Sequence, residues 1–210
     1  NTERVQTWLD KSFNANHVTQ IDQSRRPKFV QTGVEFSTVS NREDDQEYLI
    51  GNPVLQSNAT EYTIIGVLSS SLSSFVIYNQ SSLSGIDTNH YLSYETDKLF
   101  HDEFPPQVNN TFSESVSSLT KQTIASKVNT IFVAKRDNLN LKGEMSFYVN
   151  GKDISSNELF TEQYSGTSSL KHVVGSYLYN GKPKQDNGFF AGQIHELIIF
   201  DTDLELSTII

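Results

Sequence analysis

The chain lacks cysteine altogether, contains only five alanines and has no long apolar run in its 210 residues. Without cysteine the fold needs no disulfide, and thiolate metal sites and cysteine catalysis are excluded. Scarce alanine removes the best helix former and disfavours a helical domain. No apolar stretch approaches the roughly 18 residues that a membrane-spanning helix needs. We therefore expect no membrane insertion.

The charge balance is acidic, with 16 Lys and Arg against 25 Asp and Glu and a formal net charge of -9. An acidic surface repels phosphate groups, so we expect no nucleic acid as a partner and no binding to anionic membranes. Solubility is the simplest reason for such a charge. Calcium and a basic partner are the alternatives.

Aromatic and small polar residues are abundant. The chain has 13 Phe and 9 Tyr, and it is rich in Ser, Thr and Asn. These residues suit strand surfaces and turns. All-β sandwiches of this length commonly fold as one unit. We therefore expect a single all-β domain that spans residues 1–210.

Short apolar runs recur along the chain and predict about ten to twelve strands with no helix. The run at 62–68 is apolar on both faces, which favours the middle of a sheet, with 74–78 as its neighbour. Asn150 and Gly151 form a strong hairpin-turn signal because both accept positive φ. The pattern predicts a two-sheet antiparallel β-sandwich. The core side chains expected from these runs are Ile64, Val67, Phe132, Phe147, Val149, Ile194 and Leu197.

Four segments of the chain, in order, resemble the laminin-G-like jelly-roll domains of the concanavalin A-like lectin and glucanase superfamily. The first combines a Trp-x-Asp-x-Ser motif at 8–12 with an Arg-Pro turn at 26–27. The others are the apolar strand at 62–68, the Tyr-Val-Asn-Gly hairpin within 145–151 and the closing segment at 190–200. The resemblance implies a jelly-roll domain that is a segment of a longer protein.

The resemblance also bears on catalysis. Glycoside hydrolases on this fold place acidic residues alternately on one strand, so that two carboxylates reach the same groove. The nearest acidic run, at 42–47, is typical of a solvated turn. We therefore expect no catalytic residue and no enzymatic activity. The resemblance implies a structural role for Glu196, with hydrogen bonds across the sandwich.

Two loop clusters are candidates for ligand binding because each combines aromatic side chains with planar polar groups. Long polar loops on a rigid sandwich commonly carry recognition, which favours the segments 101–127 and 177–187. Loop carboxylates are the donors that calcium prefers, although no spacing here matches an EF-hand. No cofactor is required, and calcium is a candidate. The ligand-binding candidates are Trp8, Asp10, His17, Tyr177, Tyr179, Asn180, Asp186 and Asn187, and the calcium candidates are Asp44, Asp45, Asp186 and Asp201.

The leading hypothesis is a non-catalytic, lectin-like jelly-roll module of a virion or cell-surface assembly. It would contact other protein chains of that assembly and bind surface glycans. One alternative is a glycan hydrolase or lyase with a divergent active site. Another is a purely structural capsid or fibre component with no ligand.

Overall fold

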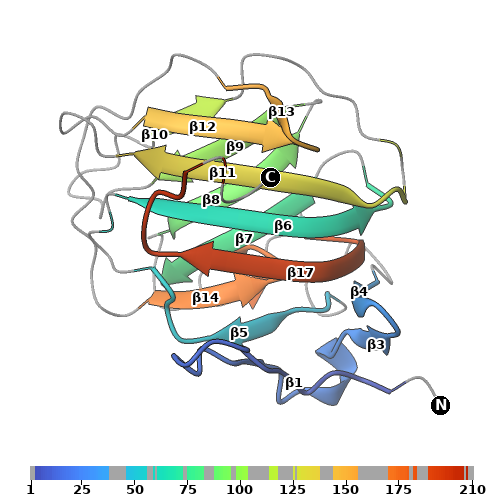
Figure 1. Ribbon diagram of the computed structural model, residues 1–210. Coiled ribbons are helices and arrows are strands. Elements are labelled where there is room, and N and C mark those ends of the chain that lie inside the picture. Colours follow the sequence, from blue (N-terminus) through green and yellow to red (C-terminus); the bar gives the residue numbers. More distant parts are fainter. Residues whose placement is uncertain are drawn as a thin grey trace.

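The computed structural model is a sandwich of two antiparallel sheets, drawn with one sheet in front of the other in Figure 1. The predicted fold class is confirmed. No helix among the described residues is long and apolar enough to cross a membrane. The structure describes residues 3–37, 46–55, 59, 61–72, 75–82, 88–95, 98–103, 114–117, 125, 127–137, 144–155, 170–179, 182–183, 189–205 and 207.

The front sheet has seven strands, in the order β13-β12-β11-β6-β17-β4-β3. Because β6 lies between β11 and β17, the predicted central position of the run at 62–68 is confirmed. The strands of this sheet are β3 (Lys28–Val30), β4 (Gly33–Phe36), β6 (Tyr62–Ser70), β11 (Thr130–Asp137), β12 (Glu144–Val149), β13 (Lys152–Asp153) and β17 (Gly192–Phe200).

The rear sheet has eight strands, in the order β1-β2-β5-β14-β7-β8-β9-β10. The prediction that 74–78 pairs with 62–68 was wrong, because β7 lies in this sheet between β14 and β8. The chain crosses from one sheet to the other between β6 and β7. The hydrophobic pattern of each strand predicts a buried strand but does not indicate which sheet it joins. The strands are β1 (Thr7–Trp8), β2 (Val18–Thr19), β5 (Leu49–Gly51), β7 (Phe75–Ser82), β8 (Thr88–Glu95), β9 (Lys98–Glu103), β10 (Glu114–Ser117) and β14 (Leu170–Val174).

Short elements complete the described structure. They are the 3-10 helix η1 (Gln23–Arg25) and the two-stranded pair β15 (Leu178–Tyr179) and β16 (Lys182–Pro183). The described residues thus form 17 strands, of which ten have four or more residues. The expected number matches these longer strands, because pairs of two or three residues leave no periodic pattern in the sequence.

The core lies between the sheets and is rich in aromatic rings. Phe75 stacks on Tyr94 at 5.3 Å between ring centroids, and it meets Phe132 of the other sheet edge-on at 6.0 Å. Phe190 adds a further edge-on contact with Phe75 at 5.5 Å. Rings from both sheets therefore join the two layers, in the geometry that aromatic pairs prefer.

Most predicted core residues are confirmed. Val67 is the exception, because it points to the outer face of the front sheet and is only half-buried. Successive residues of a strand face opposite sides, and the buried Ile64 and Leu68 occupy the inner positions of β6. Leu197 is partly buried and packs against the core. The residues confirmed as fully buried are Ile64, Phe132, Phe147, Val149 and Ile194.

The hairpin between β12 and β13 is also confirmed. Asn150 and Gly151 have φ of 51° and 77°, as a two-residue hairpin turn requires. The Asn150 side chain accepts a hydrogen bond from the Ile131 N–H at 2.9 Å. The turn is thereby tied to the neighbouring strand β11.

A bulge interrupts β17. Ile194 pairs with Leu68 and Glu196 with Val67, so His195 is an extra residue without a partner in the register. Glu196 is exposed on the outer face. The expected hydrogen bonding of Glu196 across the sandwich was therefore wrong. The extra residue sets the direction of the following side chains, as bulges do.

The C-terminal tail, residues 201–205, folds back over the outer face of the front sheet (Figure 1). The Thr63 hydroxyl donates to the Thr202 carbonyl at 3.1 Å and accepts from the Leu204 N–H at 3.0 Å. Lys135 forms an ion pair with Asp203 at 2.8 Å. The tail is therefore fixed at one end of this face.

Candidate binding surface at the N-terminal edge

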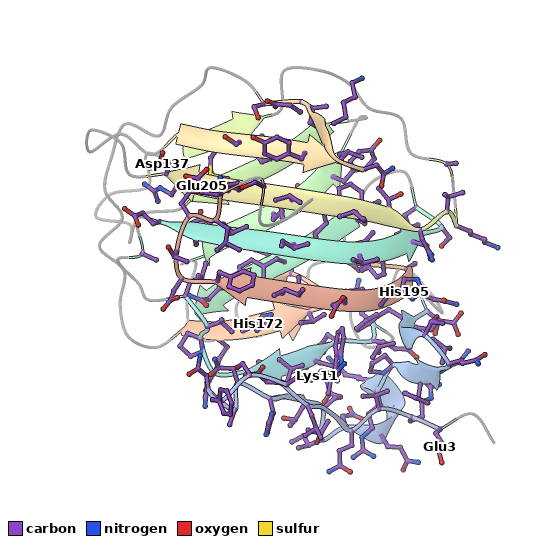
Figure 2. The ribbon with its side chains drawn as sticks, viewed as in Figure 1. Glu3, Lys11, Asp137, His172, His195 and Glu205 are labelled. Atoms are coloured by element: carbon purple, nitrogen blue, oxygen red, sulfur yellow. The ribbon has the colours of Figure 1, made fainter. Side chains whose placement is uncertain are left out.

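Residues 3–30 close one side of the sandwich. Val5 N–H donates to the Pro27 carbonyl and Phe29 N–H donates to the Glu3 carbonyl, both at 2.8 Å. Two residues after Val5 the chain enters β1, which pairs with β2 at the end of the rear sheet. The segment thus runs from the edge of the front sheet to the edge of the rear sheet. We call residues 3–30 the N-terminal edge; Glu3 and Lys11 are labelled on it in Figure 2.

An ion pair between the exposed residue Arg4 and the buried Glu47 fixes the start of this edge. Glu47 is buried, and its carboxylate binds the guanidinium of Arg4 and accepts from the Ser37 N–H at 2.7 Å. Arg4 also donates to the Arg26 carbonyl. A buried carboxylate is tolerated only when it is paired and hydrogen-bonded. Glu47 therefore requires Arg4 in place, and with it the whole N-terminal segment.

The β1–β2 hairpin carries a nine-residue loop, 9–17, that is held together by its own side chains. The Asp10 carboxylate accepts from Ser12 N–H at 2.8 Å, from the Ser12 hydroxyl at 2.7 Å and from Asn16 N–H at 2.8 Å. These bonds, chiefly that of the Ser12 hydroxyl, lower the pKa of the Asp10 carboxyl. Asp10 N–H donates to His17 Nδ1 at 3.0 Å, which joins the two ends of the loop.

The three ligand candidates from this hairpin therefore have structural contacts. Trp8 packs against the core, Asp10 organises the loop, and His17 closes it. The Trp-x-Asp-x-Ser motif is explained by this geometry. The structure brings the three residues together, and ligand binding by them stays a prediction.

The same bonds leave other side chains of the loop displayed to solvent. Leu9 is 62% exposed and Phe13 is fully exposed at the loop tip, with the exposed Lys11 between them. Ile21 and Phe29, further along the edge, are also exposed. Large apolar side chains gathered in one region mark interaction sites more often than scattered ones do. In the sequence, the signal for this exposed site was one aromatic residue, Phe13, inside a polar loop.

Like Asp10, Asp22 of this edge has its carboxylate engaged in internal hydrogen bonds. Asp22 caps η1, because its side chain accepts from the Ser24 N–H at 2.9 Å and from the Ser24 hydroxyl at 2.6 Å. Hydrogen bonds from Ser24 lower the pKa of the Asp22 carboxyl. Arg26 donates to the carbonyls of Gln20 at 2.8 Å and Ile21 at 3.0 Å. The positive charge of Arg26 also helps to lower the pKa of the Asp22 carboxyl.

Only part of the second predicted ligand cluster is described. Tyr177 is half-buried, and its carbonyl accepts from the Ser176 hydroxyl at 3.3 Å. The backbone of Tyr179 lies in β15. Asn180, Asp186 and Asn187 lie outside the described residues, as does most of the predicted recognition segment 101–127.

One of the four calcium candidates is described. Asp201 is exposed in the tail, whereas Asp44, Asp45 and Asp186 lie outside the described residues. Within the described part of the chain, no group of three or more His, Asp or Glu side chains could hold a metal ion. Calcium binding therefore stays a prediction.

A buried polar group lies behind the edge, in the rear sheet. His172 of β14 pairs with Gly51 of β5, which in turn pairs with Val18 of the hairpin. Both ring nitrogens of His172 lack a hydrogen-bond partner within the described residues, and the ring packs against Tyr78 at 5.0 Å between centroids. Burial lowers the pKa of His172 to about 4 and raises that of Tyr78.

Comparison with known proteins shows the fold alone. No family model matches the sequence, and no curated protein gives a significant match. Among solved structures, a heptameric SAP-like pentraxin from Limulus polyphemus is 16% identical with a TM-score of 0.60, over 83% of this chain and 78% of the pentraxin chain. The CBM40 domain of Ruminococcus gnavus IT-sialidase, bound to α2,3-sialyllactose, is 12% identical with a TM-score of 0.57, over 72% of this chain and 83% of that domain.

A third structure covers nearly the whole chain. The binding domain of botulinum neurotoxin DC, in complex with SialylT, is 13% identical with a TM-score of 0.56. The match covers 98% of this chain but 43% of the toxin domain. All three are β-sandwiches, and the narrower laminin-G-like assignment stays a prediction. The chain has a β-sandwich jelly-roll fold of the concanavalin A-like type.

Proposed function

We propose that this chain is a non-catalytic recognition module that contacts another protein through its N-terminal edge. The observation that carries the proposal is Phe13, fully exposed at the tip of a loop that its own hydrogen bonds hold in place. A preorganised loop loses little entropy on binding, and a displayed aromatic ring is the kind of anchor on which interfaces depend. Leu9 and Lys11 of the same loop add an apolar side chain and a positive charge.

The proposed setting is a virion or cell-surface assembly. The cysteine-free, acidic and Ser/Thr/Asn-rich composition supports it. The solved structures with a similar fold include binding domains, which supports recognition over catalysis.

Site-specific photocrosslinking tests the proposal. A benzophenone amino acid is placed at position 13 of the full chain within its native assembly. The control position is 152, in β13 at the opposite end of the front sheet. We expect a crosslink to a second polypeptide from position 13 and none from position 152. Equal crosslinking from both positions, or none from either, would overturn the proposal.

Glycan binding is the second candidate function. One similar fold is a carbohydrate-binding domain solved with α2,3-sialyllactose, whose sugar carries a carboxylate. The positive charge of the exposed Lys11, two residues from Phe13, would suit such a ligand. Binding of α2,3-sialyllactose by the wild type, weakened by K11A, would support this function. No binding would leave protein contact as the function of the edge.

A further inference from the structure

The outer face of the front sheet is unusual for a two-layer sandwich, because apolar residues occupy its centre. Outward positions normally carry polar side chains that alternate with the buried ones. Here Ile198, Ile65, Val133 and Tyr148 form a row across four adjacent strands. Val67 and Ile131 extend it in the next row. We call these six residues the outer apolar face.

This face is partly open to solvent. Ile131 is 45% exposed and Ile65, Val67, Tyr148 and Ile198 are half-buried, whereas Val133 is buried. The C-terminal tail is anchored one row away, on Thr63 and Lys135. The described part of the tail therefore lies beside the apolar row on the same face. Figure 2 views the molecule from this side, with Glu205 of the tail and Asp137 of β11 at one end of the sheet.

The two unusual surfaces differ in charge. Residues 3–37, which include the N-terminal edge, carry five basic and four acidic side chains. The described residues of β6, β11, β12, β13 and β17 with their flanking turns and tail carry four basic and eight acidic ones. Both surfaces display large apolar side chains, so they match in hydrophobicity and complement each other in charge.

We propose that the chain assembles with further copies of itself, the tip of the N-terminal edge in one copy docking on the outer apolar face of the next. This inference rests on the proposed function, since it names the partner. Leu9 and Phe13 cover the apolar row, and Lys11 lies toward acidic groups such as Glu196. Because the two surfaces are different, a pair of copies leaves the edge of one copy and the face of the other unused. A heterologous contact of this kind produces open chains or closed rings.

Sedimentation velocity on the full chain tests the contact through two monomer-forming variants. F13D adds a charge to the edge, and I131D adds one to the face at an exposed position that tolerates it. We expect the wild type to form species larger than dimers as its concentration rises. Each variant alone should lose at least about tenfold in association constant, as for a truncated interface anchor.

Mixing the two variants is the decisive measurement. The intact face of F13D can accept the intact edge of I131D, but neither chain can extend further. An equimolar mixture should therefore form dimers and nothing larger. In an isologous contact both copies use the same surface, so mixing the two variants would not restore dimers. A mixture that stays monomeric overturns the proposal.

A matched control separates the loop tip from the rest of the edge. Ile21 is 87% exposed but lies beyond Gln20, which bonds to Gln6 at the other end of the hairpin. I21D should assemble like the wild type. Equal loss in I21D, or a wild type that is monomeric at every concentration, would overturn the inference. Higher salt should weaken assembly, because opposite charges attract across the contact.

Failure of this inference is distinguishable from failure of the proposed function. A monomeric wild type that still crosslinks from position 13 to a different protein would refute self-assembly alone. A monomeric wild type with no crosslink at all would refute both. The unfolding temperatures of all variants must match that of the wild type, which circular dichroism measures directly.

Discussion

The guanidinium of Arg4 binds the buried carboxylate of Glu47, 43 residues further along the chain. Glu47 precedes β5 in the rear sheet, and Arg4 forms a bridge with Lys28 beside the front sheet. One ion pair therefore connects the N-terminal segment to both layers. Glu47 also accepts from Ser37 N–H at 2.7 Å, so two separate segments depend on its charge.

Replacing Arg4 should destabilise the fold. R4M removes the partner of a buried carboxylate, and the expected loss is about 3 kcal/mol in the free energy of unfolding. K11M is the control, since Lys11 is exposed and makes no ion pair within the described residues. Urea denaturation measures both. Equal stability of R4M and K11M would show that Glu47 is satisfied without Arg4.

Acid should destabilise the protein through His172. The folded-state pKa of His172 is about 4, below the usual 6.5, because the neutral ring is buried. The unfolded chain therefore binds the proton first. The contribution of the neutral ring is fully present above pH 6.5 and falls as the pH drops toward 4.

The variant H172L isolates this contribution. From pH 7 to pH 5 the wild type should lose about 2 kcal/mol more stability than H172L. Denaturant titrations of both proteins at several pH values measure the difference. Parallel pH profiles would mean that His172 is protonated in the fold or is solvated there.

Gly175 should tolerate no side chain. Its φ is +90°, and an added Cβ would lie 2.3 Å from the ring of Phe36. Gly151 is the matched control, because its φ is +77° and nothing lies within 4 Å of the same added atom. G151A should cost about 1 kcal/mol, the backbone term alone, and G175A clearly more because the Phe36 ring must move. Thermal unfolding ranks the two. A G175A as stable as G151A would show that the Phe36 ring moves at little cost.

Asp10 should control the loop and not the fold. D10A removes three accepted hydrogen bonds at an exposed site, so the amides of Ser12 and Asn16 should exchange on the order of tenfold faster. The unfolding temperature should stay within a few degrees of the wild type. Hydrogen exchange by NMR reads the individual amides. K11A, the neighbouring control, should leave both rates unchanged.

Several features of this protein are determined locally and could be predicted from the sequence. Strands recur wherever β-branched and aromatic residues cluster, and the Asn150–Gly151 turn follows from the ease with which both residues adopt positive φ. The fully buried Phe132 and Phe147 lie in such apolar strand runs. Each of these inferences depends on near neighbours in the chain.

Other features depend on long-range pairing and only the tertiary structure decided them. The assignment of β7 to the rear sheet, the outward direction of Val67 and the exposure of Glu196 all follow from register and from the bulge at His195. The sequence pattern was silent on these points because a strand's alternation is the same whichever face is buried. Asp10 resembled a ligand group in the sequence, but the fold of its loop directs the carboxylate to Ser12 and Asn16. The same hydrogen bonds leave Phe13 exposed, a position that no local pattern in the sequence specifies.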